Sequence, residues 1–169
     1  MRHAVLSLIL IGCASATTPT PQALPAPQAL PAPLTTFDEG PFWFGRSDHS
    51  PFGPMPYGLV AHREGDRLVL RGDVPEGMGL PPGAYQQFTF EPGPTTTLLF
   101  ETSLTGQIVR GRMVETSRSP ESITFCMPAE EGGCDQMTVN LTRVAQGILF
   151  ETQRDKGPHH RVILAATRP

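Results

Sequence analysis

Beyond residue 37 the chain consists of short apolar or alternating runs, and no window has a helical period. The clearest alternation lies in residues 137–142, where Met, Val and Leu alternate with Thr, Asn and Thr. Residues 123–127 repeat their apolar side chains with the same period of two. A strand that is buried on one face produces this pattern. We therefore expect a fold built mainly of β-strands.

Turns that contain Gly or Pro divide the chain into about nine such runs. Short links between successive runs favour antiparallel neighbours in sequence order. The predicted fold class is all-β, an antiparallel meander of about eight to nine strands that forms a small barrel or a sandwich. The expected strands are residues 57–62, 67–71, 85–91, 96–102, 107–115, 122–127, 136–144, 148–153 and 160–165.

Such a barrel resembles the lipocalin type in its architecture. Lipocalins carry a Gly-x-Trp signature near the first strand, whereas residues 40–43 of this chain read Gly-Pro-Phe-Trp, with one residue more. The likeness therefore concerns the architecture alone and implies no ligand.

The N-terminus has the features of an export signal. Residues 1–3 are a short basic start, and residues 4–11 are an apolar run, as in a secretory signal peptide. Residues 10–13, Leu-Ile-Gly-Cys, resemble the lipobox of bacterial lipoproteins. This resemblance implies a lipid on Cys13 and removal of residues 1–12. The alternative is an ordinary signal peptide that happens to contain a cysteine.

The residue after Cys13 bears on the destination. In lipoproteins an Asp at that position often marks retention in the inner membrane, and this chain has Ala14 there. The resemblance therefore implies a lipid-anchored protein of the outer membrane that faces the periplasm, with the inner membrane and the cell surface as alternatives.

A linker separates the lipidated cysteine from the folded part. Residues 14–36 contain no charged side chain and hold a tandem repeat, Gln-Ala-Leu-Pro-Ala-Pro, at 22–27 and 28–33. Proline at this density blocks helices and favours extended polyproline II. The expected organisation is a disordered tether over residues 13–36, without core contacts, and a β-rich periplasmic domain over residues 37–169. A docking site for a partner is the alternative function of the tether.

Charge and hydropathy exclude two classes of protein. The 13 Lys and Arg residues against 16 Asp and Glu give a net charge of −3. A strongly basic nucleic-acid binder is therefore not expected. No run of about 18 apolar residues is present, which argues against a spanning helix. The expected contact with the membrane is the lipid on Cys13.

The three cysteines fit one lipid and one disulfide. With Cys13 carrying the lipid, Cys126 and Cys134 are left to pair in the oxidising periplasm. They flank a turn-rich segment and lack the Cys-x-x-Cys spacing of redox motifs. No cluster of cysteine and histidine predicts zinc, and we expect no cofactor.

An aromatic-rich segment is the candidate contact surface. Residues 37–57 hold half of the aromatic side chains of the chain among Pro, Gly, Asp and His, and we expect them to be irregular. Aromatic side chains dominate many binding interfaces. The alternative is a covering segment whose rings close the open end of the core. The candidate residues for contact with a ligand or partner are Phe42, Trp43, Phe44, Phe52 and Tyr57.

No catalytic constellation emerges, and we expect no enzyme. Ser47, Asp48 and His49 are adjacent, and neighbouring residues of an extended segment point to different sides. His159 and His160 are also adjacent, so their side chains point to different sides and cannot easily bind one metal ion. The leading hypothesis is a non-enzymatic accessory or binding module for envelope proteins, and the alternative is a carrier of a small apolar ligand. A large apolar cavity beside Trp43 would favour the carrier, and a filled core the module.

Overall fold

The computed structural model describes residues 28–38, 43–47, 59–130, 132–154 and 160–166. Its one helical element is a turn of 3₁₀ helix, η1 (Leu34–Asp38), and the all-β prediction is confirmed. The strands are β1 (Trp43–Ser47), β2 (Val60–Glu64), β3 (Arg67–Asp73), β4 (Tyr85–Glu91), β5 (Thr97–Ser103), β6 (Val109–Arg118), β7 (Ser122–Pro128), β8 (Cys134–Val144), β9 (Gly147–Arg154) and β10 (His160–Ala166).

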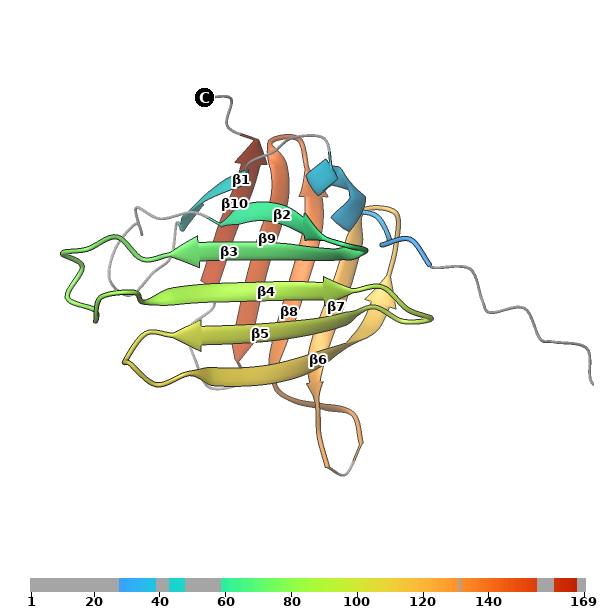
Figure 1. The fold of residues 1–169 in the computed structure, drawn as a ribbon. Helices are drawn as coiled ribbons and strands as arrows, with labels where there is room; N and C mark the ends of the chain where they lie inside the picture. Colours follow the sequence, from blue (N-terminus) through green and yellow to red (C-terminus); the bar gives the residue numbers. More distant parts are fainter. Residues whose placement is uncertain (1–27, 39–42, 48–58, 131, 155–159, 167–169) are drawn as a thin grey trace, which may run out of the picture.

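All ten strands belong to one antiparallel sheet with the order β1-β10-β9-β8-β7-β6-β5-β4-β3-β2. Each strand from β2 to β10 pairs with its neighbour in the chain, which confirms the predicted meander. The sheet curls so that β2 to β6 cross in front of β7 to β10 (Figure 1), and its two edge strands, β1 and β2, approach each other. The result is a barrel-like curled sheet and not a sandwich of two separate sheets.

Strand β1 corrects the expectation that residues 37–57 are irregular throughout. It pairs antiparallel with β10, from Trp43 opposite Ala166 to Ser47 opposite Val162. Its partner comes from the far end of the chain, and Gly45 interrupts the apolar pattern within it. Pairing over such a separation leaves no local signal in the sequence.

The end of the predicted tether is also corrected. Leu30 and Leu34, which are 5% and 0% exposed, join the hydrophobic core together with Phe37. The backbone N–H of Leu34 donates to the carbonyl oxygen of Pro31 at 2.8 Å. Burying a leucine side chain contributes about 1.5–3 kcal/mol, which offsets the cost of ordering this segment. Residues 28–36 therefore belong to the folded domain, and the prediction of a contact-free linker is wrong for them.

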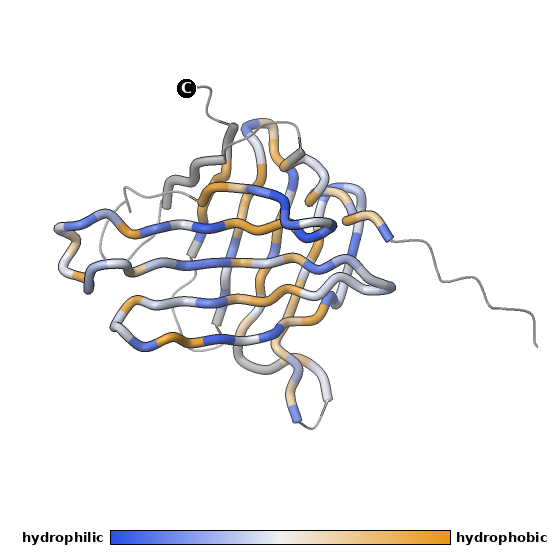
Figure 2. The backbone as a smooth tube through the Cα atoms, in the orientation of Figure 1, coloured by the Kyte–Doolittle hydropathy of each residue, from blue (hydrophilic) through white to orange (hydrophobic). Residues whose placement is uncertain are grey.

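The core lies between the two crossing layers. Hydrophobic and hydrophilic residues alternate along much of the sheet (Figure 2), although on β3 the consecutive residues Leu68, Val69 and Leu70 are all buried. The rings of Phe90 on β4 and Phe125 on β7 meet at 5.6 Å between centroids, which joins the front layer to the back layer. The fully buried side chains of largest volume are Phe90, Phe125, Leu34, Leu68, Leu70, Leu98, Met113, Ile123, Leu141, Ile148, Leu164 and Val69.

Candidate binding surfaces

The two ends of the barrel differ in how well their inward side chains are covered. On β6, Met113 is fully buried, whereas Val109, further along the same face, is 54% exposed. On β7 and β8 the inward residues Phe125 and Val139 are buried, whereas Met127 and Met137 are only partly buried. We call the end with the covered residues, where η1 lies (Figure 1), the closed end, and the other the open end.

The open end displays apolar side chains. Within the described ranges, the large hydrophobic residues that are exposed are Leu80, Ile108 and Val109. Leu80 lies in the connection from β3 to β4, and Ile108 lies just before β6, so both belong to the loops of this end. The exposed large apolar side chains of the described residues therefore lie at this end.

An open groove of about 450 Å³ lies on the outer face of β4, β5 and β6. Its outward-facing residues alternate with the core positions of the same strands. Leu99 is the one large apolar side chain among them, and polar or charged side chains surround it. The outward residues that line the groove are Gln87, Thr89, Leu99, Glu101, Arg110 and Arg112.

Glu101 anchors one side of the groove. Its carboxylate accepts hydrogen bonds from the Tyr85 hydroxyl and from Nε of Arg110, the latter at 2.5 Å. The Tyr85 bond, followed by the Arg110 bond, holds the pKa of Glu101 below its ordinary value of 4.5. The same bond to Glu101 raises the pKa of the Tyr85 hydroxyl. Glu101 is therefore an ionised group whose charge Arg110 already balances.

Two arginines near the groove differ in their partners. Arg71 is 2.9 Å from the Asp73 carboxylate, donates to Gln87 at 3.3 Å, and lies over the Tyr85 ring at 4.2 Å. Arg112, on β6, is exposed, and its one hydrogen bond to the described residues is a long one of 3.5 Å to the Thr97 hydroxyl. Among the residues that the structure describes, no carboxylate forms an ion pair with Arg112. Arg112 is thus the groove cation that a ligand can engage.

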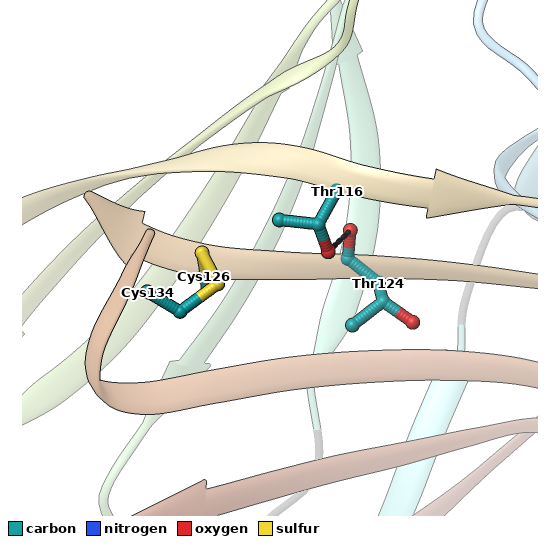
Figure 3. The surroundings of a disulfide bond; sticks show 4 residues. All are labelled: Thr116, Thr124, Cys126 and Cys134. Atoms are coloured by element: carbon teal, nitrogen blue, oxygen red, sulfur yellow. Dashed lines mark hydrogen bonds between the residues drawn. A yellow bond between two sulfur atoms is a disulfide. The ribbon is translucent and has the colours of Figure 1, made fainter. Parts of the chain in front are cut away.

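The predicted disulfide is present at the open end. Cys126 and Cys134 are joined, with their Cα atoms 5.4 Å apart, near the tip of the β7–β8 hairpin (Figure 3). Beside them the Thr116 hydroxyl of β6 donates to the Thr124 carbonyl oxygen of β7 at 3.3 Å. The crosslink ties the hairpin together from Cys126, the residue at which β7 stops pairing with β6.

Two of the five candidate residues from the aromatic segment lie among the described residues. Trp43 and Phe44 lie in β1, paired with Ala166 and Ala165 of β10. Phe42, Phe52 and Tyr57 lie outside the described residues, as does Cys13. The adjacent Asp48 and His49, and His159 of the histidine pair, lie outside them as well.

Sequence reasoning did not find the groove. Leu99 and Arg112 become neighbours only through the register of β5 against β6. The available signal was Leu99 itself, an apolar residue directly after Leu98, where an alternating strand would place a polar side chain.

Two general features are absent from the described part of the chain. It contains no group of three or more His, Cys, Asp or Glu side chains arranged to hold a metal ion. It contains no helix long and apolar enough to cross a membrane.

Comparisons of the chain with models of protein families, with curated proteins and with solved structures gave no significant match.

Proposed function

We propose that this protein is a lipid-anchored component of the bacterial outer membrane whose barrel serves as a non-enzymatic binding module for another envelope protein. The groove on β4, β5 and β6 is the proposed contact surface. The observation that carries this proposal is the exposed Arg112, without a described ion-pair partner, beside the apolar side chain of Leu99. A cation next to an apolar side chain is more typical of a binding interface than of a surface that faces only water.

The lipobox-like residues 10–13 support the anchor. Residues 14–27 separate Cys13 from the first described residue, and in polyproline II they would span about 40 Å at about 3.1 Å per residue. Two or three acyl chains on one residue hold a protein on a membrane without any apolar patch of its own. The tether would leave the groove accessible to a partner.

The filled core favours a module over a carrier. The closed end is packed with fully buried side chains, and the groove lies on the outside of the sheet. One observation keeps the carrier as a second candidate, namely the partly buried Phe88 and Phe100 at the open end. Solvent extraction of the purified mature protein distinguishes the two, since an apolar compound recovered at one molecule per protein would favour the carrier.

A photo-crosslinking experiment in living cells tests the proposed function. A photoreactive amino acid at Thr89 lies in the groove, and the same amino acid at Thr142 on β8 is the matched control on the other layer. We expect a defined protein adduct from position 89 that Arg112→Glu weakens by about tenfold. Identical adducts from both positions would contradict a contact surface at the groove. Incorporation of a fatty-acid analogue by a Cys13→Ser variant would contradict the anchor.

A further inference from the structure

Strand β6 changes its pairing halfway along its length. Its residues from Val109 to Val114 pair with β5, whereas its pairing with β7 begins only where Val114 meets Cys126. From that point β6 and β7 diverge, β6 towards the β5–β6 turn and β7 towards the disulfide hairpin (Figure 1). Residues 109–113 therefore have β5 on one side and no described strand on the other.

Among the described strands, this edge carries backbone groups without a ladder partner. In an antiparallel sheet every second residue directs its N–H and C=O to the same neighbour, so part of residues 109–113 points away from β5. No proline interrupts these residues. Edges of this kind are the templates on which extended segments add as a further strand.

The middle of the edge leaves little steric obstruction. Gly111 has no side chain, and a Cβ at this position would collide with the Phe100 ring. The ring of Phe100 thus occupies the place of the missing side chain on the inner face. Flanking Gly111 on that face are Met113, which is buried, and Val109, which is exposed at the open end. An added strand would meet an apolar inner face here.

The outer face of the same edge is cationic. Arg110 and Arg112 project from it towards the groove. Arg110 is balanced by Glu101, whereas Arg112 has no described ion-pair partner. A strand placed beside residues 109–113 would therefore have one face towards an unbalanced positive charge and the other towards apolar side chains. A segment in which acidic and apolar residues alternate complements both faces.

We infer that residues 109–113 of β6 receive an extended segment of the partner protein by strand addition, with an acidic side chain opposite Arg112 and apolar side chains towards the open end. This inference rests on the proposed function and specifies the chemistry of the partner and its mode of binding. Backbone hydrogen bonds would supply affinity, and Arg112 would select the acidic residue.

The test uses the mature protein and a capped peptide of alternating Glu and Val. Amide hydrogen exchange is measured residue by residue, together with the affinity. We expect amides within residues 109–113 to exchange at least about tenfold more slowly with the peptide bound, because strand pairing protects them. Two isomers of the peptide are then compared, each N-methylated along one edge of its backbone so that this edge cannot donate hydrogen bonds. Only the isomer whose free edge faces β6 should still bind. Equal binding of both isomers would overturn strand addition.

Charge variants separate the edge from general electrostatics. Arg112→Glu should weaken binding of the acidic peptide by at least about tenfold. The same substitution should improve binding of a peptide of alternating Lys and Val. Arg67→Glu on β3, whose arginine pairs with Glu91 outside the groove, is the matched control and should change neither affinity. Equal losses in both variants would overturn the role assigned to Arg112. Protection of the edge that depends on protein concentration alone would indicate pairing between two copies and would overturn the partner peptide.

The outcomes remain distinct from those of the proposed function. Absence of peptide binding, with the Thr89 adduct intact in cells, would overturn strand addition and leave the groove as the contact surface. Peptide binding at the edge without a Thr89 adduct would support strand addition and contradict the groove as the contact surface in cells.

Discussion

The closed and open ends of the barrel are built from the same strands but are completed in different ways. At the closed end, η1 and the preceding Leu30 add to the core, and the inward side chains are covered. At the open end, Val109 is exposed, the methionines of β7 and β8 are partly buried, and a disulfide ties the hairpin. Covered apolar surface contributes stability, whereas exposed apolar surface and unpaired edges are available to a partner. The edge proposed for partner binding thus runs towards the open end, away from the end where the core is best covered.

A carboxylate also strengthens the closed end. Glu115 on β6 accepts from the backbone N–H of Thr96 at 2.8 Å and from Nε of Arg118 at 2.7 Å. Burial by itself would raise the pKa of Glu115, but the hydrogen bonds from Arg118 and Thr96 hold it below 4.5. This arrangement joins the β4–β5 turn to the part of β6 that pairs with β7.

The largest expected effect comes from breaking the closed end at its N-terminal segment. Leu30→Asp would place a carboxylate at a site that is 5% exposed. Losing the burial of the leucine and burying a charge should cost at least about 3 kcal/mol. Denaturant unfolding of the mature protein measures this loss.

The tandem repeat supplies a matched control for that variant. Leu24 occupies the same place in the first copy of the repeat and lies outside the described residues. Leu24→Asp should leave the unfolding midpoint unchanged, because residues 14–27 are still predicted to be a tether. Equal losses from both variants would contradict the assignment of the domain boundary to the second copy. Deleting one copy is less informative, because the identical remaining copy would provide the same leucine.

The repeat also shows what local sequence can reveal. Strand β4 coincides with its predicted range, residues 85–91, because alternation is a local property. Leu24 and Leu30 have identical neighbours, so the burial of Leu30 depends on contacts with distant strands that the local sequence does not record. Strand β1 and the groove depend in the same way on partners far along the chain. Register between strands decides these features, and single-sequence patterns do not encode it.

The second-largest effect is expected at the open end. There the disulfide stabilises the structure, as η1 does at the closed end. Replacing both Cys126 and Cys134 by serine should cost roughly 2–3 kcal/mol in the chain-entropy model. Hydrogen exchange should accelerate in the β7–β8 hairpin and stay unchanged at Leu34. A thiol assay on unfolded, unreduced protein should find no free thiol before reduction and two afterwards. Acceleration at Leu34 as large as in the hairpin would show that the two ends are not independent.

The smallest expected effect is a change in how the stability of the closed end depends on pH. A carboxyl group whose pKa is lowered in the folded state stabilises the protein above its unfolded pKa, and this stabilisation is lost as the pH falls through the folded value. For Glu115 the loss begins below its ordinary pKa of 4.5. Glu115→Gln should therefore cost about 1–2 kcal/mol at neutral pH and should flatten the dependence of stability on pH in the acidic range.

The matched control for this variant is Glu121→Gln, in the adjacent turn between β6 and β7, where the glutamate is exposed. Denaturant unfolding from pH 7 to pH 3 should separate the two variants at neutral pH and bring the Glu115→Gln variant and the unmodified protein together in acid. Because Arg118 and Thr96 are the donors, Arg118→Gln should reproduce part of the same loss. A constant difference between Glu115→Gln and the unmodified protein over the whole range would mean that the carboxylate acts through its shape and not through its charge. The charge of Glu115 would then contribute nothing to the stability of the closed end.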